Sequence, residues 1–133
     1  MFTAPEQPGE VASLLGAARR DFLAFELLSA QPAAPPEVVF FLAQQSIEKV
    51  MKAVLAHRKV AYRKTHDLVE LSALLCDNKL PNLLPENLMI RLGPYAVEMR
   101  YVNIAAPKID VEEVRTAVNR LLAWAQDSVG DHR

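Results

Sequence analysis

Nine prolines divide this chain into segments, and their positions constrain the fold more than any other feature. Eight of them lie between runs in which apolar residues recur every three or four positions, and only Pro94 lies inside such a run. Because proline breaks a helix interior but is tolerated at its ends, this pattern predicts helices joined by proline-bearing connections. Apolar–polar alternation typical of a strand does not persist. The sequence therefore predicts an all-α fold, an up-and-down antiparallel bundle of four to five helices.

The expected helices cover residues 9–30 and 37–60, and three more begin at 65, at 85–86 and at 110. We expect Thr65 to cap the third helix, with Asp67 inside its first turn. Gly93–Pro94 should kink or split the fourth, which closes at Tyr101. Asp110 and Glu113 have the spacing of a capping box. The predicted core stripes include Leu15, Phe22, Phe25, Phe40, Ile47, Val54, Leu68, Leu71, Leu74, Leu88, Tyr95, Val114 and Leu121.

Length and composition exclude several classes of protein. A chain of 133 residues fits a single domain, with a core over about 11–127 and flexible ends at 1–8 and 128–133. A hydrophobic content of 51% with a net charge of -1 argues against intrinsic disorder. No apolar run of about 18 residues and no leader-like start are present, so we expect neither a membrane span nor a signal peptide. The single cysteine, Cys76, is expected in the core of a reduced, cytoplasmic protein.

Basic residues are concentrated in one segment. Residues 49–66 contain six Lys or Arg and two His with no acid, whereas the rest of the chain has 9 basic and 16 acidic residues. Such a segment on an acidic body favours binding of phosphates or of an acidic partner. The alternative is a solvated helix end and loop.

Three groups of residues are candidates for a binding site. On the second helix, Gln44, Gln45, Glu48, Lys49 and Lys52 lie opposite the apolar stripe, where the amides can bridge to another helix or to a second subunit. Glu48 and Lys52 also have the spacing of a helix-stabilising ion pair.

His66 follows Lys64 and Thr65 at an expected helix start, where free amides attract anions. The alternative is simple capping with an exposed imidazole. Arg100 can bind a phosphate and Tyr101 can stack on a base. Alternatively, Arg100 pairs with Glu48 or Glu98, and both Tyr95 and Tyr101 fill the edge of the core.

Several kinds of chemistry have no support in the sequence. There is no glycine-rich phosphate loop, and His57, His66 and His132 do not have metal-ligand spacing. No nucleophile, base and orienting group stand out together. We therefore expect no metal and no cofactor.

Taken in order, the segments resemble the HEPN domain, an all-helical family named for nucleotide binding. The resemblance covers residues 17–124 and rests on residues 20–23, 41–55, 64–68 and 95–101. Its most specific parts are the pattern Gln-Gln-x-x-Glu-Lys-x-x-Lys-Ala at 44–53 and Lys-Thr-His-Asp-Leu at 64–68. The residues that match the family pattern are Gln44, Gln45, Glu48, Thr65, Asp67, Tyr95 and Glu98.

The resemblance implies a bundle that commonly forms a homodimer and that often works beside a minimal nucleotidyltransferase, as a toxin–antitoxin or substrate-binding pair. Many such domains are ribonucleases with Arg, four to six residues, then His, and no arginine of this chain has a histidine at that distance. We therefore favour a non-catalytic nucleotide-binding or partner-binding module. The alternatives are a ribonuclease toxin acting on RNA and a homodimeric scaffold without a ligand. The predicted contacts with a nucleotide, RNA or partner are Lys49, Lys52, Lys64, His66, Arg100 and Tyr101.

Overall fold

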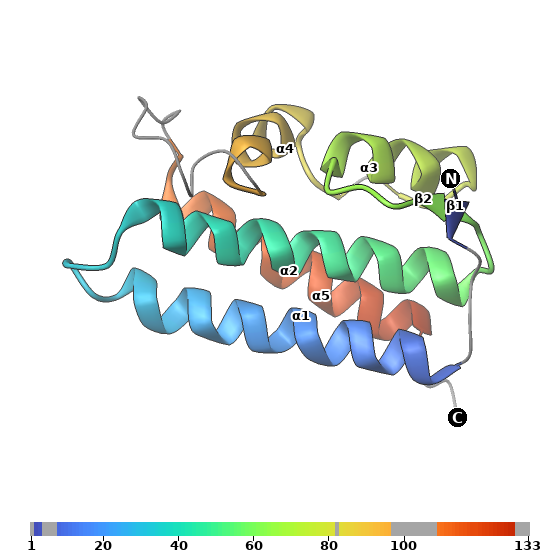
Figure 1. The fold of residues 1–133 in the computed structure, drawn as a ribbon, viewed down its shortest axis with the longest axis horizontal. Coiled ribbons are helices and arrows are strands. Elements are labelled where there is room, and N and C mark those ends of the chain that lie inside the picture. The colour runs from blue at the N-terminus through green and yellow to red at the C-terminus, as the bar shows by residue number, and fades with distance from the viewer. Residues whose placement is uncertain (1, 4–7, 82, 97–108, 130–133) are drawn as a thin grey trace.

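The computed structural model describes residues 2–3, 8–81, 83–96 and 109–129, and most of the described residues are helical. The three long helices are α1 (Pro8–Ser29), α2 (Pro36–His57) and α5 (Val111–Val129). The shorter helices α3 (Leu68–Asp77) and α4 (Glu86–Leu92) lie on the side of α2 away from α1 (Figure 1). The predicted all-α bundle is therefore confirmed.

Helix α2 is the centre of the fold, and α1, α3, α4 and α5 all pack against it. Its apolar stripe is buried as predicted, with Ile47, Val50 and Val54 each fully buried. On the opposite face Gln44 and Glu48 are buried too, and both contact His66 in the connection before α3. As predicted, α1 runs antiparallel to α2, whereas α5 runs in the same direction as α2 (Figure 1). The segment carrying α3 and α4 returns the chain to the end where α2 begins.

The end of α2 differs from the prediction. The helix stops at His57 rather than near residue 60, because Lys59 adopts a left-handed conformation with φ of 60°. The N–H of Lys59 bonds the Ala56 carbonyl and that of Val60 bonds the Leu55 carbonyl, which together form a Schellman motif. Because this position usually holds glycine, no ordinary stop signal marks it in the sequence.

The start of α3 also differs. The helix begins at Leu68, and its cap is Asp67 rather than Thr65. The Asp67 carboxylate accepts the N–H groups of Val69 and Glu70 at 3.0 and 3.3 Å. The Thr65 hydroxyl accepts the Asp67 N–H at 3.0 Å, so it braces the cap from outside the helix. A carboxylate at this position also suits the positive end of the helix dipole.

The predicted break at Gly93–Pro94 is confirmed, since α4 ends at Leu92 and a 3-10 helix, η1 (Gly93–Ala96), follows. Residues 97–108 lie outside the described part of the chain, and with them Glu98, Arg100 and Tyr101.

Helix α5 begins at Val111, one residue after the predicted start. Asp110 accepts the N–H of Glu112 at 3.3 Å, which is half of the expected capping box. The Glu113 carboxylate instead binds Arg91 of α4 at 3.3 Å.

Two residues near the core test the sequence predictions directly. Tyr95 is only 1% exposed, as expected of a core tyrosine. Cys76, expected in the core, is exposed instead. Helix α3 buries Leu68, Leu71, Ser72 and Leu75, and one further residue along a helix turns the next side chain about 100° away from that face.

A short strand pair, not expected from the sequence, ties the start of the chain to the connection between α2 and α3. Strand β1 (Phe2–Thr3) pairs antiparallel with β2 (Tyr62–Arg63).

Candidate functional site: a polar centre between α2 and the α3 connection

Glu48 is the centre of a buried polar network on α2, on the side facing α3. Its side chain is only 6% exposed. The Gln44 amide, itself fully buried, donates to Glu48 Oε1 at 3.3 Å and to the His66 carbonyl at 3.0 Å. The Gln45 amide donates to Gln44 Oε1 at 2.8 Å. The two glutamines therefore hold the connection before α3 against α2 within one chain. Of the two predicted bridges, to another part of the same chain or to a second subunit, the structure shows the first.

His66 extends from this buried centre to the surface. Its Nδ1 lies 3.0 Å from Glu48 Oε1, while its side chain is 59% exposed. An ionised carboxylate only accepts hydrogen bonds, so this contact places a proton on Nδ1. The outward Nε2 is then an acceptor when the ring is neutral and a donor when it is protonated. The arrangement presents one oriented imidazole nitrogen to a ligand.

Lys52 neutralises the other oxygen of Glu48. Its Nζ lies 2.9 Å from Glu48 Oε2, as the spacing on the helix predicts, and its side chain is only 15% exposed. The ammonium also lies 5.8 Å from the centre of the Tyr62 ring, within range of a cation–π contact. Burial, followed by the carboxylates of Glu10 and Glu48, raises the pKa of the Tyr62 phenol above its usual value. Tyr62 is a member of the centre that sequence analysis did not single out.

The other predicted site residues do not all join this centre. Lys49 points toward α1, where its Nζ lies 2.6 Å from Asp21. Lys64 is exposed in the connection, two residues before His66. Of the predicted contact residues that the structure describes, Lys52 and His66 therefore meet at Glu48, and Lys49 is held elsewhere.

The first turn of α3 does not offer the free amides that the sequence predicted as an anion site. Its Val69 and Glu70 amides are already bonded to the Asp67 carboxylate, so they are not bare. An anion near His66 would have to use side-chain cations instead.

Nearby, Arg58, Lys59 and Lys64 are exposed and form no ion pair within the described residues, whereas Arg63 binds Glu70 at 2.6 Å. Three cations of the connection are therefore open to an anionic ligand.

Within the described ranges, no group of three or more His, Cys, Asp or Glu side chains is placed so that it could hold a metal ion. No described helix is long and apolar enough to cross a membrane.

Comparison with known proteins agrees with this fold. The model of the HEPN domain family matches residues 11–128, so this chain belongs to the HEPN family. The crystal structure of an archaeal HEPN homologue superposes with a TM-score of 0.58 over 90% of this chain and 98% of the other, at 20% identity. At 20% identity, this similarity shows a shared fold and nothing more. No curated protein matches the sequence.

Proposed function

We propose that this HEPN domain is a non-catalytic module that binds a phosphate-bearing ligand, a nucleotide or RNA, at the connection between α2 and α3. One observation carries the proposal: Arg58, Lys59 and Lys64, which have no ion-pair partner among the described residues, lie in the same short connection as the oriented imidazole of His66. Protonated His66 would add a donor at Nε2. The buried Glu48–Lys52 pair holds this imidazole in place and is not itself free to bind phosphate.

Arg100 and Tyr101 remain part of the proposed site, as a guanidinium for phosphate and a ring for base stacking. They lie in the segment outside the described residues, so their contribution is tested separately by Arg100→Ala.

The proposal is tested by titrating ATP and a short single-stranded RNA into the wild type and into Arg58→Gln combined with Lys64→Gln. We expect weaker binding in the variant. For RNA, the slope of log affinity against log salt should become shallower by roughly 0.7 for each phosphate that the variant no longer neutralises. Lys79→Gln with Arg120→Gln is the matched control, since both residues are exposed cations on other surfaces. Equal affinity in the two double variants, or no binding by the wild type, would overturn the proposal.

Partnership with a minimal nucleotidyltransferase, as a toxin–antitoxin or substrate-binding pair, is the second element of the proposal. The membership of this chain in the HEPN family supports it. We expect an adjacent reading frame to encode a nucleotidyltransferase. We also expect the product of that frame to co-purify with this protein. The absence of co-purification with that product would reject the pairing.

RNA cleavage is the second candidate function, and one observation favours it. A carboxylate that orients an exposed imidazole, as Glu48 orients His66, is an arrangement that supports acid–base catalysis. The Arg-x4–6-His pattern of the family ribonucleases is missing from the sequence. Cleavage of RNA by the wild type that is lost in His66→Gln would establish this function and replace the non-catalytic proposal.

A further inference from the structure

A pocket of about 450 Å³ lies where the turn between α1 and α2 meets the start of α5. Figure 1 shows this turn at the end of α2 that is remote from β2. The apolar walls of the pocket come from α1, α2, η1 and the residues that lead into α5, and they include Leu28, Val39, Phe40, Tyr95, Ile109 and Val111. The three of these that come from α2 and η1 belong to the buried core, so the pocket has a fixed inner wall. A cavity of this size with mostly apolar walls is typical of a small-molecule site.

The hydroxyl of Tyr95 is a polar group of this pocket that has no partner. Tyr95 is only 1% exposed and its ring packs on that of Phe40 with the centres 5.4 Å apart, yet its hydroxyl forms no hydrogen bond with any described residue. Buried phenols normally find such a partner. By contrast, the Ser29 hydroxyl in the same wall donates to the Glu26 carbonyl at 3.2 Å and accepts from Arg115 at 3.1 Å. The Tyr95 hydroxyl is therefore a donor left for a ligand.

The charges around the pocket decide which ligand can use that donor. None of the described residues that line the pocket is charged. Burial, followed by the nearby carboxylate of Glu37, raises the pKa of the Tyr95 phenol above its usual value. The hydroxyl therefore keeps its proton at neutral pH and can donate it. A phosphate or carboxylate would meet the field of Glu37 without a cation in the wall to offset it, so the ligand's acceptor has to be uncharged.

We infer that this pocket binds a neutral aromatic molecule with a carbonyl or ether oxygen that accepts a hydrogen bond from Tyr95. The rings of Phe40 and Tyr95, tilted by 57° to each other, offer an aromatic wall to such a molecule. The inference does not rest on the proposed phosphate site. That site uses the connection that follows α2, whereas the pocket lies at the start of α2, so the two can be tested independently.

The first test is a fluorescence titration with Prodan, a neutral naphthalene ketone whose emission moves to shorter wavelength in apolar surroundings. We expect saturable binding to the wild type with such a shift. Tyr95→Phe keeps the ring and removes the hydroxyl, so it should weaken binding roughly two- to tenfold, as the loss of one hydrogen bond does. Naphthoate, a carboxylate with the same ring system, should not displace Prodan. No saturable binding by the wild type, equal affinity in Tyr95→Phe, or displacement by naphthoate would each overturn the inference.

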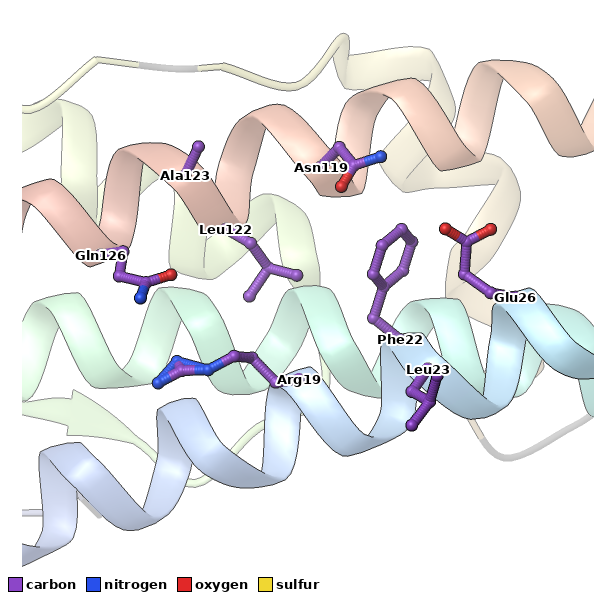
Figure 2. Close-up of a pocket in the computed structure, with 8 residues that line it drawn as sticks. All are labelled: Arg19, Phe22, Leu23, Glu26, Asn119, Leu122, Ala123 and Gln126. Carbon is purple, nitrogen blue, oxygen red and sulfur yellow. The ribbon is translucent and has the colours of Figure 1, made fainter.

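The second test locates the bound molecule by filling the pocket. Ala34 lies in the turn and lines the pocket, so Ala34→Trp should abolish Prodan binding. Ala123→Trp is the matched control. Figure 2 shows Ala123 on α5, beside a separate groove of about 390 Å³ between α1 and α5. We expect Ala123→Trp to bind Prodan like the wild type, with both variants folded by circular dichroism. Binding that survives in a folded Ala34→Trp, or that is lost in Ala123→Trp instead, would place the molecule elsewhere and overturn the inference.

Discussion

Glu48 Oε1 lies 3.0 Å from Nδ1 of His66, and this contact joins the middle of α2 to the connection before α3. One atom is buried on the central helix and the other belongs to an exposed ring, so the pair fixes a surface group from the interior. The carboxylate also accepts from Lys52 and Gln44, which leaves it fully engaged. Both the stability of the fold and the orientation of the candidate site therefore depend on Glu48.

Replacing Glu48 with Ala should destabilise the protein by about 3–5 kcal/mol, because it leaves a largely buried Lys52 without its partner. The free energy of unfolding in urea measures this change. Glu70→Ala, which removes the partner of the half-exposed Arg63, is the control and should have a much smaller effect. Similar losses for the two variants would contradict a central role for Glu48.

Truncation of the core should show the same contrast between buried and exposed positions. Ile47→Ala and Leu71→Ala should each cost about 2–5 kcal/mol, since both side chains are fully buried and leave a cavity. Ile90→Ala, at a position 58% exposed, should cost far less. Denaturant unfolding provides the comparison. A loss under about half a kcal/mol at Ile47 would be inconsistent with its position in the core.

Substitutions of Asp67 and Thr65 should differ in their effect on stability, because only Asp67 caps α3. Asp67→Ala removes the acceptor of two helix amides and should cost about 1 kcal/mol. Thr65→Ala removes a single bond outside the helix and should cost less. Thermal unfolding of both variants checks the order, and a larger effect at Thr65 would restore it as the cap.

The raised pKa of the Tyr62 phenol predicts that the protein loses stability in alkaline solution. Burial and the two nearby carboxylates raise its pKa above 10.0 in the folded state, so the folded protein holds this proton more tightly than the unfolded chain. The stabilising contribution is complete below pH 10 and is lost as the pH rises through the folded pKa. The unfolding free energy of the wild type should therefore fall relative to that of Tyr62→Phe above that pH. A constant difference between the two proteins would contradict the prediction.

The sequence by itself determined the fold class and most of the helices. Proline positions and the three-and-four spacing of apolar residues are local signals, and they placed α1, the start of α2 and the break at Gly93–Pro94 within a residue or two. They also identified Ile47, Leu71 and Tyr95 as core residues. The ends of α2 at His57 and of α3 at Asp77 were hidden, because Lys59 and Lys79, two residues beyond them, adopt a left-handed conformation that sequence reasoning expects of glycine.

Only the tertiary structure decided what the polar face of α2 does. Gln44 and Glu48 are part of a polar pattern on the helix, yet the connection before α3 covers them, so they are buried. His66 is separated from Glu48 by 18 residues and reaches it only when that connection folds back. The direction of Lys49 toward Asp21, 28 residues away, was equally undetermined. Helical periodicity reports which residues share a face, whereas the pairing of distant polar groups depends on which element covers that face.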